Sequence, residues 1–123
     1  MSGQSKIPHL ICPGMQLPEL GKFSFAIHFR GERREAFLIR FKGVVYCYLN
    51  ECMHMHKRLD DERDQIFDET GRFLRCSSHG ACYDPATGKS LSEIGAGKML
   101  TAVKVKEEAG WIGLADKKAV LCG

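Results

Sequence analysis

The feature that most constrains this 123-residue chain is a pair of short cysteine and histidine motifs in its middle third. The first motif is Cys52-x-His54, the second is Cys76-x-x-His79, and residues 55–75 separate them. Each motif joins one thiolate to one imidazole, and both groups bind transition metals. A fold that brings the two motifs together would hold a metal site between two loops. We therefore expect the rest of the chain to form the platform that carries these loops.

The segments around the motifs have the composition of short β-strands. Apolar and β-branched runs predict strands at residues 23–29, 35–41, 44–49, 99–106, 111–115 and 119–121, and a hairpin of 65–67 with 72–75 ahead of Cys76. Proline-rich residues 1–21 are predicted to be extended rather than helical. No amphipathic helix of three turns is evident, and there are roughly nine short strands. The sequence therefore predicts an all-β fold, an antiparallel β-sandwich or small barrel.

Alternation along two of these strands predicts which side chains share a face. In residues 44–49, Val44, Tyr46 and Tyr48 should lie on one face, whereas Val45, Cys47 and Leu49 should lie on the other. In residues 99–106 we expect one face to carry Met99, Thr101, Val103 and Val105. The strand at 44–49 ends directly before Cys52, so the first motif should lie on a loop at a strand end, where functional residues are usual.

Composition excludes several classes of function. The net charge is +3 and the densest basic group, residues 30–34, contains a glutamate, which indicates a solvated hairpin turn rather than a nucleic-acid surface. No run of eighteen apolar residues is present, so no membrane span is expected. The N-terminal residues lack a charged leader followed by an apolar stretch, which predicts no signal peptide and a cytoplasmic location.

Six cysteines would suit a disulfide framework in a secreted protein, but reducing compartments keep thiols free. With Cys52 and Cys76 taken as ligands, four cysteines remain. Cys47 lies in an apolar run and is expected to be buried. Cys12 and Cys122 lie near the chain ends and are expected to be exposed or frayed.

The order of ligand types within each motif indicates the kind of metal site. A Cys2His2 zinc finger pairs cysteine with cysteine and histidine with histidine, whereas each motif here supplies one of each. Mixed loops suit a binuclear centre whose two irons receive different ligands, as in a Rieske [2Fe–2S] cluster with two thiolates on one iron and two imidazoles on the other. A mononuclear zinc site with a structural role is the alternative.

The residues around the motifs strengthen this interpretation. Cys52-Met53-His54 followed by Leu59, and then Cys76-Ser77-Ser78-His79-Gly80, resembles the Rieske pattern C-x-H-x-x-x-x-L with C-x-x-H-G. The resemblance implies one Rieske-like domain over residues 1–123, with a cluster-binding subdomain of two loops at about 50–97. It also implies that Cys52 and Cys76 bind the buried iron, and that His54 and His79 bind the outer iron near the surface.

Departures from the family pattern narrow the expected function. Quinol-oxidising members carry an extra cysteine in each loop, and Lys57 and Ser78 occupy those positions here. High-potential members have a serine and a tyrosine after the second histidine, whose hydroxyls donate hydrogen bonds to cluster sulfurs. Here the two positions are Ala81 and Tyr83, so Tyr83 is either a cluster hydrogen-bond donor or a packed strand residue. We expect a potential in the lower half of the Rieske range of roughly −150 to +300 mV.

The resemblance implies an electron carrier rather than an enzyme, which would transfer one electron from a reductase to an oxygenase through transient docking. A complete oxygenase would need a mononuclear iron bound by two histidines and a carboxylate, for which the chain has no motif and no room. A cluster-bearing small subunit of a larger oxidoreductase, such as a nitrite reductase, is the second alternative.

Overall fold

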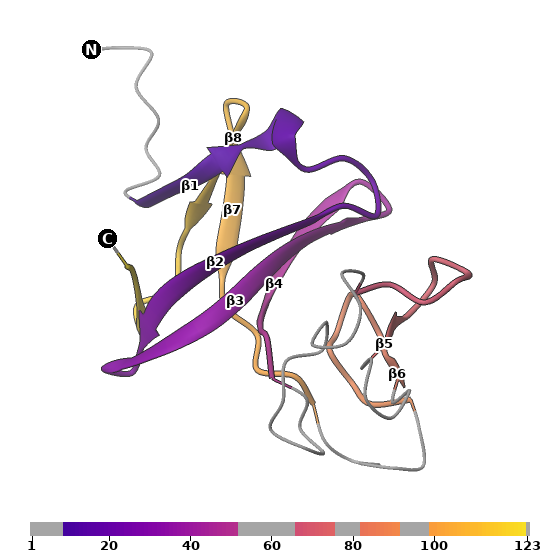
Figure 1. The fold of residues 1–123 in the computed structure, drawn as a ribbon. Helices are drawn as coiled ribbons and strands as arrows, with labels where there is room; N and C mark the ends of the chain where they lie inside the picture. The colour runs from indigo at the N-terminus through magenta and orange to yellow at the C-terminus, as the bar shows by residue number, and fades with distance from the viewer. Residues whose placement is uncertain (1–8, 52–65, 76–81, 92–98, 123) are drawn as a thin grey trace.

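The computed structural model describes residues 9–51, 66–75, 82–91 and 99–122, and these residues form a β-structure with one short 3-10 helix (Figure 1). The strands are β1 (His9–Pro13), β2 (Lys22–Phe29), β3 (Glu32–Phe41), β4 (Val44–Leu49), β5 (Leu74–Arg75), β6 (Cys82–Tyr83), β7 (Val105–Glu108), β8 (Trp111–Leu114) and β9 (Ala119–Leu121). The helix, η1 (Gly14–Gln16), follows β1. This architecture confirms the predicted all-β antiparallel fold.

The strands form three antiparallel sheets. β1-β8-β7 and β4-β3-β2-β9 pack against each other, and the small sheet β5-β6 lies to one side of them (Figure 1). The described residues contain no helix with the length and apolar content needed to cross a bilayer.

Tight hairpin turns set the register of the longest strands. The β2–β3 turn has positive φ at Arg30 (53°) and Gly31 (83°), and the β3–β4 turn has positive φ at Lys42 (53°) and Gly43 (81°). Two consecutive left-handed residues match the twist of the flanking strands, and glycine adopts this conformation without steric cost. The first turn is shorter than the predicted 30–34 segment, because Glu32 already pairs with Phe29.

Strands β3 and β4 bury both of their faces, which divides the interior into two cores. On one face, Leu38, Cys47 and Leu49 pack in a first core between the two larger sheets. On the other, Phe37 and Tyr48 join a second core. The second core also contains Ile39 from β3. Its other members lie in or near the small sheet: Ile66, Phe67, Leu74, Tyr83 and Leu100. The predicted alternation in residues 44–49 is confirmed, and this central pair of strands carries the small sheet.

Burial of the cysteines outside the two motifs follows strand pairing more than distance from the chain ends. Cys47 is 2% exposed, as predicted. The prediction that Cys12 is exposed was wrong, because β1 pairs with β8 and leaves Cys12 only 3% exposed in the first core. Cys122 is partly buried, and its Sγ lies 3.5 Å from His28 Nδ1. An N-terminal strand that is tied into a sheet does not fray.

The prediction of one continuous strand over residues 99–106 was also wrong. Met99 is 48% exposed whereas Leu100 is 2% exposed, so the alternation does not hold at its start. The reason is that this segment crosses between the cores: the Leu100 N–H donates to the Gly88 carbonyl at 2.8 Å, whereas the Val103 N–H donates to the Cys47 carbonyl at 2.9 Å. The ladder of β7 begins only at Val105.

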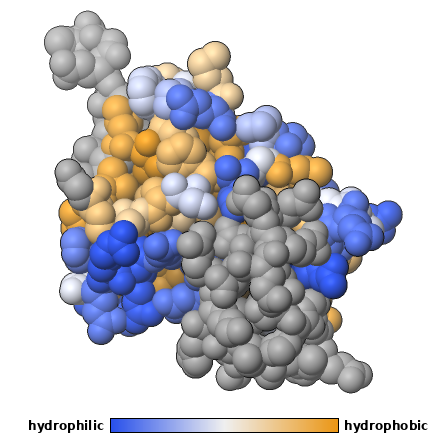
Figure 2. Space-filling view, viewed as in Figure 1, coloured by the Kyte–Doolittle hydropathy of each residue, from blue (hydrophilic) through white to orange (hydrophobic). Residues whose placement is uncertain are grey.

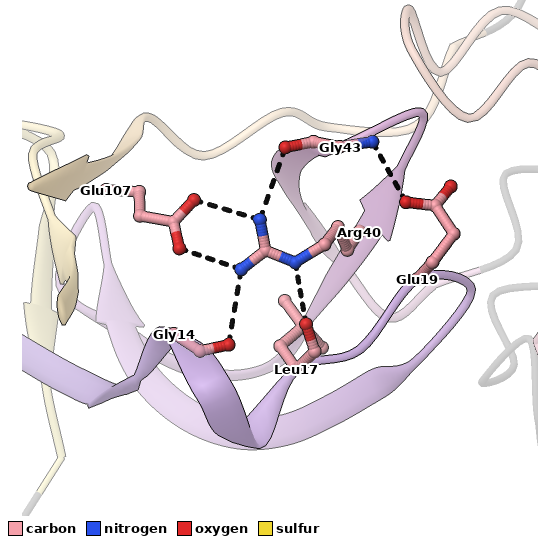
Figure 3. A network of polar contacts seen from close by, with 6 residues as sticks. All are labelled: Gly14, Leu17, Glu19, Arg40, Gly43 and Glu107. Carbon is pink, nitrogen blue, oxygen red and sulfur yellow. Dashed lines mark hydrogen bonds and ion pairs between the residues drawn. The ribbon is translucent and has the colours of Figure 1, made fainter. Parts of the chain in front are cut away.

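One arginine joins three distant parts of the platform (Figure 3). The Arg40 guanidinium donates to both carboxylate oxygens of Glu107 on β7, at 2.9 and 2.7 Å. It also donates to the carbonyls of Leu17 at 2.6 Å, and of Gly14 and Gly43 at 3.2 Å. A planar five-donor group suits this arrangement, since the ammonium of lysine cannot reproduce its geometry. Arg40 therefore fixes the segment after β1 against the C-terminal end of β3.

We predict that Glu107→Gln lowers the free energy of unfolding at neutral pH by about 1–2 kcal/mol, because it removes a charge-assisted bidentate pair. The Arg40 hydrogen bonds hold the pKa of Glu107 below its ordinary value, against the effect of burial. A carboxylate whose pKa is lower in the folded than in the unfolded state stabilises the fold at pH values above the unfolded-state pKa. This stabilisation is lost as the pH falls through the folded-state pKa. The difference between the two proteins in urea unfolding should therefore shrink below about pH 4.

Lys106→Gln provides the control for this prediction, because it breaks an ion pair with Glu108 whose lysine is 61% exposed on the same strand. We expect it to change the free energy of unfolding by less than about 0.5 kcal/mol. Equal effects of both substitutions would contradict a special role for the Arg40–Glu107 pair.

Candidate metal centre

The predicted ligands Cys52, His54, Cys76 and His79 lie outside the described residues, so the structure places only the segments that lead to them. The described segments end at Glu51 before the first motif, and at Arg75 and Cys82 on either side of the second. The structure therefore shows how the residues next to the motifs are held, and whether hydrogen bonds connect them.

The second motif lies between two paired strands. β5 and β6 are antiparallel, with Leu74 opposite Tyr83 and Arg75 opposite Cys82. β5 and β6 are therefore consecutive antiparallel strands that flank the part of the sequence containing Cys76 and His79. On the other side of β5, the Arg75 N–H donates to the Ile66 carbonyl at 2.9 Å. The predicted hairpin before Cys76 is confirmed for its described residues, with its turn closed by a hydrogen bond from Gly71 N–H to the Asp68 carbonyl at 3.1 Å.

The first motif follows the end of β4, as predicted. The Leu49 N–H donates to the Thr101 carbonyl at 2.9 Å, and the Asn50 N–H donates to the Glu35 carbonyl at 2.8 Å. Asn50 is only 2% exposed. Next to it, the Glu51 carboxylate accepts a hydrogen bond from the Arg34 guanidinium. The chain therefore reaches Cys52 from a segment that is fixed to the central sheet.

A turn at residues 84–88 connects β4, which precedes the first motif, to β6, which follows the second. It is closed by a hydrogen bond from the Gly88 N–H to the Asp84 carbonyl at 2.7 Å, and it directly follows β6. The buried Tyr48 hydroxyl on β4 donates to the Pro85 carbonyl at 2.8 Å. The strand that leads to the first motif is thereby tied to the segment that follows the second, which supports the prediction that the two motifs act together.

The predicted donor set, which lies outside the described residues, has the composition that a binuclear iron–sulfur group requires. Two thiolates and two imidazoles are the ligands of a Rieske cluster. Among the described residues, no three histidine, cysteine, aspartate or glutamate side chains lie close enough together to hold a metal ion. Burial raises the pKa values of the Cys47 and Cys12 thiols, which disfavours the thiolate that a metal requires.

Comparison with known families agrees with these observations. The model of the Rieske [2Fe-2S] domain family matches residues 8–104. The chain belongs to the Rieske [2Fe–2S] domain family. The cofactor of this family is the [2Fe–2S] cluster, as the ligand pattern predicts.

Solved structures share the Rieske fold at low sequence identity. The ferredoxin of carbazole 1,9a-dioxygenase from Nocardioides aromaticivorans IC177 is 22% identical with a TM-score of 0.68, over 92% of this chain and 100% of that chain. The Sphingomonas yanoikuyae B1 ferredoxin is 19% identical with a TM-score of 0.65, over 89% and 97%. One chain in the structure of the reduced complex between oxygenase and ferredoxin in carbazole 1,9a-dioxygenase is 17% identical to this chain, with a TM-score of 0.67.

The match to that complex covers 85% of this Rieske chain but only 27% of the matched chain. At these identities the likeness establishes the fold alone. No curated protein matches the sequence.

Tyr83 is the one predicted site residue that the structure describes. It lies in β6, is 1% exposed and packs in the second core. Packing in the core and donation to a cluster sulfur are compatible, because a buried tyrosine has an apolar ring and a polar tip. The role of Tyr83 as a hydrogen-bond donor to the cluster stays a prediction.

Sequence reasoning missed the Arg34–Glu51 pair that stands before the first loop. The prediction of a solvated turn at residues 30–34 agrees with Arg33, whose side chain is 62% exposed. It does not agree with Arg34, whose side chain is 37% exposed and paired with Glu51. The available signal was the position of Glu51 directly before the first ligand, since a carboxylate there requires either water or a cationic partner.

We predict that Tyr83→Phe lowers the reduction potential of the cluster, because a hydroxyl that donates to a cluster sulfur stabilises the more negative reduced state. Redox titration followed by visible absorbance measures the effect. Tyr46→Phe is the matched control, since it removes a hydroxyl from another tyrosine that packs against the same core. An unchanged potential in Tyr83→Phe would leave Tyr83 with a packing role only.

Proposed function

We propose that the four ligands are Cys52, His54, Cys76 and His79, and that the protein is an electron carrier rather than an enzyme. The observation that carries the proposal is the match of the Rieske family model over residues 8–104, which includes both motifs. When bound, a Rieske cluster accepts and releases one electron at a time. The described residues next to both motifs are hydrogen-bonded to neighbouring segments, which suits loops that hold a cluster.

The proposed partners are a reductase that donates the electron and an oxygenase that accepts it. Two ferredoxins with this fold support the proposal, one of which is the ferredoxin of a dioxygenase, and a structure of an oxygenase–ferredoxin complex supports it further. On either side of residues 92–98, Leu91 is 52% exposed and Met99 is 48% exposed. Small exposed apolar surfaces suit the weak, transient contacts of electron transfer.

We also propose that residues 1–123 form a single Rieske domain, because the two cores share strands β3 and β4. A cytoplasmic location is proposed from the thiols, since the four cysteines among the described residues are free. Reducing compartments keep cysteines in this state.

We predict that Cys52→Ser and Cys76→Ser each abolish the visible colour of the purified protein and its content of iron and inorganic sulfide, because a serine hydroxyl is a poor replacement for a thiolate ligand of the cluster. Cys122→Ser is the matched control, since this partly accessible thiol is not a proposed ligand. It should retain iron and sulfide in equal amounts.

Wild-type protein that contained zinc without inorganic sulfide would support a structural zinc site and overturn the proposal. Protein with an intact cluster that copurified stoichiometrically with a large catalytic subunit would instead favour an obligate component of a larger oxidoreductase. Stopped-flow mixing of the reduced protein with an oxygenase component tests the carrier role directly.

A further inference from the structure

The end of the β2–β3 hairpin lies beside the start of the first ligand loop, and hydrophilic side chains gather there (Figure 2). From β3, the Arg34 Nη1 donates to a carboxylate oxygen of Glu51, and its Nη2 donates to Glu32 at 2.6 Å. The side chains of Arg34 and Glu51 are 37% and 29% exposed. The guanidinium therefore joins β3 to the last described residue before Cys52.

Main-chain hydrogen bonds fix the last described residues before Cys52. The N–H groups of Leu49 and Asn50 donate to neighbouring segments, and the Glu51 N–H donates back to the Leu49 carbonyl at 2.9 Å. This last bond closes a tight turn directly after β4. The Glu51 side chain provides a further contact that holds this end of the described segment, and its partner is Arg34.

We propose that Arg34 is a positioning residue for the first ligand loop. By holding Glu51 it sets the direction in which the chain leaves the sheet toward Cys52, and it compensates a negative charge one residue from that ligand. The inference rests on the proposed function, because it takes Cys52 as a cluster ligand.

Anchoring and charge compensation have different consequences, which makes the proposal testable. Removing either partner releases the loop, so both single variants should lose the cluster faster. Reduction adds one negative charge, so the unpaired Glu51 left by Arg34→Gln should lower the potential, whereas Glu51→Gln should raise it. A residue that merely stabilised the fold would not shift the potential in opposite directions.

The experiment compares the cluster-loaded wild type with Arg34→Gln, Glu51→Gln and the double variant. The readouts are the reduction potential and the rate of cluster loss to an iron chelator, followed by visible absorbance. Arg33→Gln is the matched control, because it makes the same charge change on the adjacent residue, whose side chain is 62% exposed and 4.0 Å from Glu35. Successive strand residues face opposite sides, so Arg33 is directed away from Glu51.

We expect each single variant at Arg34 or Glu51 to lose the cluster about two- to fivefold faster than wild type, consistent with one partly buried ion pair. The double variant should be no faster than the singles, and Arg34→Lys should be intermediate because lysine keeps the charge without the two-pronged geometry. Cluster loss as slow as in Arg33→Gln, or potentials that shift in the same direction, would overturn the inference. A wild type without an iron–sulfur signal would instead overturn the proposed function itself.

Discussion

The structure depends on strands β3 and β4 being buried on both faces. A strand that packs on one side carries polar residues on the other, but β3 and β4 place large apolar side chains on both. Phe37 and Tyr48 on one face require a cover, and the described residues of the small β5–β6 sheet and its flanking turns provide it. Burial of apolar area thus attaches the small sheet, which flanks the second proposed ligand motif, to the larger sheets, with no disulfide among the described residues.

Hydrogen bonds and ion pairs then set the relative positions of the segments that apolar packing brings together. The hydrogen bond from the Tyr48 hydroxyl to the Pro85 carbonyl joins β4 to the turn after β6, and the Arg34–Glu51 pair holds the end of the same strand. Hydrophobic burial has no orientation, whereas a buried hydroxyl and a guanidinium place their partners within tenths of an ångström. A four-ligand cluster shared by two loops requires such placement, because one ligand that moves away breaks the site.

The sequence alone predicted most of the fold, for physical reasons that differ between elements. The alternation in β4 was readable because both faces are apolar and each face has its own core. The burial of Cys12 was not predicted because it comes from pairing with β8, far along the chain, and no local pattern reports a long-range strand pair. Residues 99–104 were mispredicted because they cross between two cores, which interrupts the period of two. The two motifs predict a ligand set that lies outside the described residues, whereas the contact between Arg34 and Glu51 is one that motif spacing does not reveal.

The central claim is that a thiolate and an imidazole from each loop hold one [2Fe–2S] cluster on this platform. Electron–nuclear double resonance on the dithionite-reduced wild-type protein tests it most directly, because it detects nitrogen nuclei bound to the reduced cluster. We expect a signal from a single unpaired electron coupled to two histidine nitrogens, and loss of one coupling in a His54 or His79 variant that retains iron. A reduced cluster without nitrogen coupling, or a protein with no paramagnetic signal and bound zinc, would contradict it.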